Sequence, residues 1–195
     1  MAFENNLTAA AQAISAVRQV CLFGAANKPR DVERGGMWGK VSKTKLLCKL
    51  AEHEFFKLDA DMLPRQDAIP IDARLGGTFR AGTCETQASI AFELLRKLQV
   101  ARPLDFMATT NGAHAFLVIG RTGGAANWQD WGADAVVCDP WLNECPSVNS
   151  GGVGPGWEDW PFRPSKWASC DLVLGAQTPQ KLSSYPFESQ YRLEV

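Results

Sequence analysis

The chain has 195 residues, of which 46% are hydrophobic and 21% are charged. This is the size and composition of one soluble globular domain, and it excludes a disordered or fibrous protein. The 20 basic and 21 acidic side chains leave a net charge of −1, so the chain as a whole has no field that favours nucleic acid or an anionic membrane surface.

No targeting or spanning segment is recognisable in the sequence. Residues 1–20 lack the basic start and the continuous apolar run of a secretory signal. No stretch approaches the roughly 18 uninterrupted apolar residues that a membrane-spanning helix requires. We therefore expect a single domain over residues 1–195, no membrane span, a protein that is cytoplasmic as made, and six cysteines that stay reduced. Export into a target cell by a route that needs no signal peptide stays open.

Residues 1–60 carry two helical patterns. Strong helix formers with apolar side chains at helical spacing run over residues 7–20, and a second pattern runs from about Lys43 to Phe56. From Asp59 to Arg80, two prolines, two adjacent glycines and short apolar runs predict a loop or an irregular edge strand. The sequence thus predicts a helical N-terminal part, followed by little regular structure.

A third helix is predicted from Cys84 to about Gln99, since Gly82 or Thr83 can cap it and Glu85 lies in its first turn. We expect this helix to be the central helix of the fold. Its apolar positions follow the spacing of a buried stripe and comprise Ala88, Ala91, Phe92, Leu95 and Leu98.

Three strands are predicted after this helix. The alternating residues 104–110 and the apolar run 113–120 flank Asn111-Gly112, a pattern typical of a hairpin with a tight turn. Residues 135–139 form a further short strand, and residues 169–174 are a candidate for a last one. We expect an α+β fold in which the central helix packs on this antiparallel sheet.

Cys84 has the setting of a catalytic thiol. A thiol attacks as the thiolate, and the N–H groups and dipole of a helix N-terminus stabilise that anion. The chain has two histidines, and His53 lies between two glutamates in the polar end of a predicted helix. The candidate for a general base is therefore His114.

The strand pattern brings an acid to this histidine. Pairing Gly120 with Ala133 in antiparallel strands sets His114 opposite Asp139. A carboxylate beside the imidazole fixes its tautomer and supports the imidazolium that forms when the thiol gives up its proton. The sequence thus predicts a triad of Cys84, His114 and Asp139.

The segments Gly82-Thr83-Cys84, His114-Ala115-Phe116 and Asp139-Pro140-Trp141 resemble the core of the transglutaminase-like branch of the papain-like superfamily, over residues 80–142. The resemblance implies a papain-like fold and a catalytic core in which the triad attacks amides through a thioester. Bacterial effectors and toxins of this type are often small, and they cleave or deamidate a protein inside a target cell. The chain departs from the family in its longer loop between the histidine and the aspartate. It also has no glutamine at the papain spacing before the cysteine, which leaves the oxyanion hole unassigned.

Trp128, Trp131 and Trp141 are candidates for the walls of a substrate groove, and the first two lie in the loop beside the proposed site. Cys138 precedes Asp139 and so points to the opposite face, while Cys21, Cys48, Cys145 and Cys170 have no nearby base, and all five are expected to be structural. No close pair of cysteines or histidines has metal-ligand spacing, so the sequence predicts no metal site and no cofactor. The glycine-rich run 151–156 lacks the Lys-Ser or Lys-Thr of a phosphate loop and is interpreted as a linker.

The expected function is a thiol-dependent amide hydrolase, either a cysteine protease or a glutamine deamidase, whose substrate is a host or target-cell protein. Transamidation shares the same first step. An arylamine-type acyltransferase, which residues 80–85 distantly resemble, and a cell-wall amidase stay open, although the short chain argues against the acyltransferase. A noncatalytic module that binds a partner through its Trp-rich tail is the alternative from another class.

Overall fold

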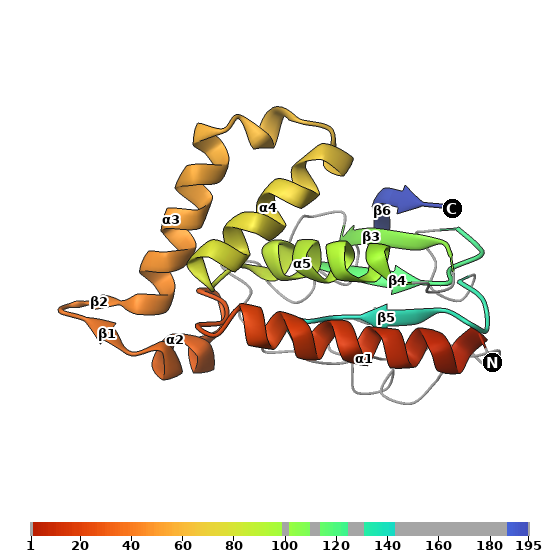
Figure 1. Ribbon diagram of the computed structural model, residues 1–195, viewed down its shortest axis with the longest axis horizontal. Helices are drawn as coiled ribbons and strands as arrows, with labels where there is room; N and C mark the ends of the chain where they lie inside the picture. Colours follow the sequence, from red (N-terminus) through yellow and green to blue (C-terminus); the bar gives the residue numbers. More distant parts are fainter. Residues whose placement is uncertain (1, 99–101, 110–113, 125–130, 143–186, 195) are drawn as a thin grey trace, which may run out of the picture.

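The computed structural model describes residues 2–98, 102–109, 114–124, 131–142 and 187–194. Within these ranges the fold is α+β, with helices packed on an antiparallel four-stranded sheet, as Figure 1 shows. The predicted fold class and the antiparallel sheet are confirmed. None of the described helices has both the length and the apolar character needed to cross a membrane.

The helices account for most of the chain before the sheet. The elements in this part are α1 (Ala2–Val20), α2 (Pro29–Gly35), the hairpin β1 (Met37–Trp38) and β2 (Val41–Ser42), α3 (Lys43–Lys57), the 3-10 turn η1 (Ala60–Met62), α4 (Arg65–Phe79) and α5 (Cys84–Lys97). The three predicted helices are confirmed as α1, α3 and α5, although α1 begins five residues earlier than predicted.

Helix α4 occupies the segment that was predicted to be a loop or an edge strand, so that prediction is wrong. Pro70 lies inside this helix and removes one backbone donor. A Cβ on Gly76 would lie 2.4 Å from Thr86 Cγ2 on α5, so only glycine allows the two helices to approach this closely. Thr86 and Ser89 of α5 donate hydroxyl hydrogen bonds to Asp72 of α4, at 2.9 and 3.0 Å. The glycine that suggested a loop therefore allows α4 to pack closely on α5.

The sheet has the strand order β5-β4-β3-β6, and every neighbouring pair is antiparallel. The predicted hairpin and third strand are confirmed as β3 (Leu104–Thr109), β4 (Ala115–Ile119) and β5 (Val136–Cys138). An edge strand that was not predicted, β6 (Phe187–Leu193), pairs with β3. The Asn111-Gly112 turn, residues 151–156 and residues 169–174 lie outside the described part of the chain.

The register between β4 and β5 differs from the prediction. Ile119 pairs with Val136, so the predicted register is wrong by two residues. Because side chains alternate with a period of two, this shift keeps each side chain on its predicted face. His114 and Asp139 therefore share a face as diagonal neighbours, and they are not directly opposite each other.

The hydrophobic core lies between the sheet and helices α1 and α5. Because α5 packs on this core, most of the helix is buried, while Cys84 at the N-terminal end of α5 is only partly buried. Leu98, which was predicted for the buried stripe, lies beyond the end of α5 and is exposed. The central core side chains include Ala10, Ile14, Val17, Ala88, Phe92, Leu95, Leu104, Phe106, Leu117, Ile119, Val136 and Cys138.

Candidate active site

Cys84 is the first residue of α5, as predicted. The N-cap residue is Thr83, whose backbone is extended and whose hydroxyl makes no capping hydrogen bond. The N–H of Gln87 donates to the Thr83 carbonyl at 3.0 Å, so this is the first turn of the helix. The N–H groups of such a turn have no acceptor within the helix, and together with the helix dipole they favour an anion at this end.

The segment before Cys84 is fixed by the loop that follows α1. Phe23 N–H donates to the Arg80 carbonyl at 3.0 Å, and Gly82 N–H donates to the Gly24 carbonyl at 3.1 Å. A Cβ on Gly82 would lie 2.4 Å from Thr86 Cγ2, so the chain needs glycine there to enter the helix. These contacts hold the start of α5, and with it Cys84, against the end of α1.

His114 and Asp139 form a buried pair, as the sequence predicted. His114 Nε2 lies 2.8 Å from Asp139 Oδ2, and the two side chains are only 1% and 0% exposed. The other carboxylate oxygen, Oδ1, accepts a hydrogen bond from Leu142 N–H at 3.1 Å. Asp139 is thus held by the turn that follows β5, and it fixes the orientation of the imidazole.

The pKa of His114 reflects this pairing. Burial by itself lowers the pKa, but the charge of Asp139 and its hydrogen bond raise it, and the nearby Cys84 adds to the rise. The result is a pKa raised from the ordinary value of 6.5 to about 9. The imidazole therefore holds a proton readily at neutral pH. Because Nε2 faces Asp139, Nδ1 is the ring nitrogen left to interact with the thiol of Cys84.

Trp141 forms a wall beside this imidazole. Its ring meets the His114 ring edge to face, with centroids 5.5 Å apart. Its indole N–H donates to Asn27 Oδ1 at 2.9 Å, and its carbonyl accepts from Lys28 Nζ at 2.6 Å. Asn27 and Lys28 were missed by the sequence analysis, because they lie more than 110 residues from Trp141 along the chain and match no motif.

Trp131 differs from Trp141 in that it does not line the larger cavity described below. Trp131 is 0% exposed and its ring packs 6.5 Å from that of Phe116, which in turn stacks on His114. Trp131 thus supports the imidazole through Phe116 and does not line an open groove, which corrects the role predicted for it. Trp128 lies outside the described residues.

Two cavities border the N-terminal end of α5. The larger, about 850 Å³, lies between the second half of α1 and the turn after β5, and its lining includes Gln87, Trp141 and Lys28. The smaller, about 370 Å³, lies towards α3 and is lined by Thr83 and Thr86 among others. Cys84 and His114 line neither cavity.

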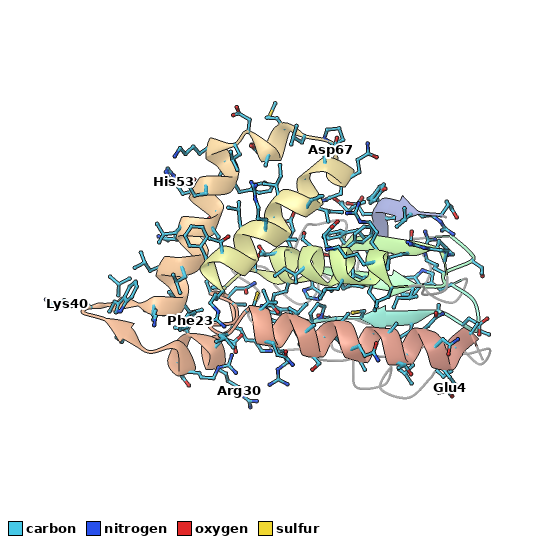
Figure 2. The ribbon with its side chains drawn as sticks, in the orientation of Figure 1. Glu4, Phe23, Arg30, Lys40, His53 and Asp67 are labelled. Atoms are coloured by element: carbon cyan, nitrogen blue, oxygen red, sulfur yellow. The ribbon has the colours of Figure 1, made fainter. Side chains whose placement is uncertain are left out.

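The remaining described cysteines and the other histidine stand apart from this arrangement. Cys21, Cys48 and Cys138 are buried, and burial raises the pKa of Cys21 to about 12 and that of Cys48 to about 11. His53 is exposed on the outer side of α3 (Figure 2). Among the described residues, no group of three or more potential ligands could hold a metal ion.

Comparison of the chain with models of known families, with curated proteins and with solved structures finds no match. Any assignment of chemistry therefore depends on the geometry of Cys84, His114 and Asp139.

Proposed function

We propose that the chain is a thiol-dependent amide hydrolase that acts on a protein substrate, as a cysteine protease or a glutamine deamidase. The observation that carries the proposal is the buried pair of His114 and Asp139, at 2.8 Å, whose imidazole interacts electrostatically with Cys84 at the start of a helix. A thiol, a base and an acid that orients the base are the parts that nucleophilic catalysis on an amide requires.

The first half of the reaction uses the proton that the thiol gives up. His114 accepts this proton, which its raised pKa favours, and the Cys84 thiolate attacks the carbonyl carbon of the amide. A carbon–sulfur bond forms and the carbonyl oxygen becomes an oxyanion. The imidazolium then donates the proton to the amide nitrogen and the carbon–nitrogen bond breaks. An amine or ammonia departs, and the acyl group stays on Cys84 as a thioester.

Water completes the cycle. The neutral imidazole takes a proton from a water molecule, whose oxygen attacks the thioester carbonyl. The carbon–sulfur bond breaks, the product leaves as a carboxylic acid, and the thiol and imidazole share one proton again. The N–H groups of the first turn of α5 can donate to both oxyanions, and we assign the oxyanion hole in part to the backbone of Cys84.

The proposed fold family is the papain-like superfamily, in its transglutaminase-like branch. Support comes from the chain order of Cys84, His114 and Asp139 and from the packing of α5 on the sheet that bears the base and the acid. The free thiols among the described residues suit a reducing compartment, such as the cytoplasm of the producing cell or of a target cell.

The larger cavity supports a protein substrate with acidic side chains near the attacked amide. It passes Trp141, which contacts His114, and continues along α1 and α2. Its lining holds the basic residues Arg18, Lys28, Arg30 and Arg34, and the acidic residue Asp31. Asp31 is already engaged by Arg34 and by the Ala25 N–H. The charge of this wall therefore favours an anionic stretch of polypeptide.

Alkylation with iodoacetamide tests the catalytic pair without knowledge of the substrate. We expect Cys84 to react near neutral pH at least about tenfold faster than glutathione, an ordinary exposed thiol, because a cationic imidazole favours its thiolate. In His114→Ala, the rate should fall to that of glutathione or below. Equal rates at Cys84 in the wild type and in His114→Ala would contradict the proposal and favour a noncatalytic binding module.

Incubation with candidate proteins then separates the possible outcomes of the reaction, with Cys84→Ala as the control. Fragments indicate a protease, a small mass increase without fragments indicates a deamidase, and cross-linked products indicate a transglutaminase. Product formation by Cys84→Ala at the wild-type rate would rule out the proposed nucleophile.

A further inference from the structure

The β1–β2 hairpin projects from the body of the molecule. Its strands pair Met37 with Ser42 and Trp38 with Val41, and the turn between them contains Gly39 at φ 60°. Figure 1 shows the hairpin reaching away from the sheet, and Figure 2 shows Lys40 at its tip. Strands of two residues contribute little stability of their own, so strand pairing alone does not explain the hairpin.

Three large apolar side chains of this hairpin face solvent. Met37, Trp38 and Val41 are 59%, 56% and 50% exposed. Adjacent exposed side chains of this size leave apolar area in water, which is unfavourable unless a partner covers it. The composition of the hairpin therefore indicates a contact surface.

The chain around the hairpin is strongly basic. Residues 28–45 contain six basic and two acidic side chains, a net charge of +4, whereas the whole chain carries −1. The basic residues are Lys28, Arg30, Arg34, Lys40, Lys43 and Lys45. The balanced total charge thus conceals one end of the molecule that attracts anions.

Lys43 holds the hairpin in a defined orientation. Its Nζ lies 4.3 Å from the centroid of the Phe23 ring and 5.2 Å from that of Trp38, and its backbone N–H donates to the Gly36 carbonyl at 3.0 Å. These contacts join the hairpin to the loop that fixes the start of α5. The hairpin is therefore preorganised, with its apolar side chains held in place, and less entropy is lost on binding.

We propose that this hairpin is a membrane-binding arm that inserts Met37, Trp38 and Val41 into the interfacial layer of an anionic bilayer. Tryptophan favours the interface because its ring is apolar and its N–H is polar. Lysine suits the same place, since its stem packs on apolar groups while its ammonium reaches the headgroups. Each basic residue near an anionic surface strengthens binding roughly fivefold.

The same composition suits a protein partner less well. Protein interfaces are enriched in arginine and depleted in lysine, and the hairpin together with the first turn of α3 carries Lys40, Lys43 and Lys45. Another exposed apolar group, which includes Phe56, Leu58 and Met62, provides a contrast. Met62 is 82% exposed, but its neighbours Asp59 and Asp61 are acidic and would repel an anionic surface.

Co-sedimentation of the full chain with lipid vesicles tests the proposal. We expect the wild type to bind vesicles of phosphatidylcholine mixed with phosphatidylserine, to bind pure phosphatidylcholine at least about tenfold more weakly, and to lose affinity as salt rises. The double variant Met37→Ser/Trp38→Ser should bind the mixed vesicles about tenfold or more weaker. Lys40→Glu should also weaken binding, whereas Met62→Ser is the matched control and should bind like the wild type.

Two results would overturn the proposal: no binding of the wild type to mixed vesicles, or equal binding by the wild type and the double variant. A concentration-dependent dimer that the double variant abolishes, without vesicle binding, would identify the hairpin as a protein-contact surface and also overturn it. A cooperative thermal unfolding transition is the control that each variant is folded. Because the assay needs no catalysis, its outcome is independent of the proposed hydrolase activity.

Discussion

The helical layer that carries Cys84 and the sheet that carries His114 surround acidic side chains differently: Asp72 of α4 is partly buried, and Asp105 of β3 is fully buried. Between α4 and α5, Asp72 accepts hydrogen bonds only from the hydroxyls of Thr86 and Ser89 among the bonds described, and burial raises its pKa to about 6. In the sheet, Asp105 is fully buried but meets the guanidinium of Arg121 through two bonds, at 2.7 and 3.0 Å.

The difference teaches how each half of the site is stabilised. A buried carboxylate that is hydrogen-bonded only by hydroxyls keeps part of its desolvation cost, whereas one paired with a guanidinium recovers much of it. Asp105 also accepts from Ser189 of β6 at 2.8 Å, which ties the edge strand to the sheet. The sheet is therefore a firm support for His114 and Asp139, and the helix pair is a tightly packed but less stable support for Cys84.

The largest expected effect is on catalysis, where the two halves must act together. If the proposed function holds, His114→Ala should lower kcat/KM by about 10³-fold or more. Asp139→Asn should leave a measurable remainder, about tenfold or more above His114→Ala, because the imidazole is less well oriented but still present. Assays with a protein substrate of the enzyme measure both, and full activity of His114→Ala would contradict the mechanism.

The next largest effect is expected in the sheet. Asp105→Ala leaves the buried guanidinium of Arg121 without its carboxylate, and it should lower the free energy of unfolding by about 3–5 kcal/mol. Glu93→Ala is the control, since its ion pair with Arg96 lies on the surface of α5 and should contribute less than about 1 kcal/mol. Urea unfolding measures both variants. Similar losses in the two would show that the buried pair is not the firm support inferred here.

The pH dependence of stability should separate the two halves. The pKa of Asp72 is raised from 3.8 to about 6 in the folded protein, so the folded state binds more protons than the unfolded state in this window. The stability of the wild type relative to Asp72→Asn should therefore fall as the pH rises from 3.8 to about 6, by on the order of 2–3 kcal/mol.

His114 gives the same sign in a higher window. Its pKa is raised from 6.5 to about 9, so the stability that the protonated imidazole contributes is present below pH 6.5 and is lost as the pH rises towards 9. Unfolding of the wild type and of His114→Gln across this range measures the loss. A difference that does not change with pH would contradict the ion pair with Asp139.

The smallest expected effect concerns the approach of α4 to α5. Gly76→Ala forces a Cβ to within 2.4 Å of Thr86 Cγ2, and the resulting strain should cost about 1–3 kcal/mol of unfolding free energy. Gly77→Ala is the matched control, because its Cβ would meet Val20 Cγ1 at an ordinary 3.7 Å. This second change should be neutral or stabilise the helix by about 0.5–1 kcal/mol. Equal effects would mean that close packing does not explain Gly76.

Much of the sheet half could be predicted from sequence, because its signals are local. Alternating residues before Asn111-Gly112 and an apolar run after it predict β3 and β4, and the next apolar run predicts β5. The register was wrong by two residues, and a shift of two leaves each side chain on the same face of the sheet. His114 and Asp139 therefore still lie together. The edge strand β6 was missed, since its position depends on the long-range contact of Ser189 with Asp105.

The sequence by itself determined the helix that begins at Cys84, the hairpin whose second strand follows His114, and the candidate triad, because periodicity and helix-start signals act over a few residues. Only the tertiary structure decided that α4 is a helix, that Asn27 and Lys28 hold Trp141, and that Trp131 is buried. The physical reason is the same in each case. The glycines of α4 and the side chains around Trp141 acquire their roles from neighbours that are distant in the chain, and no local pattern records a contact of that kind.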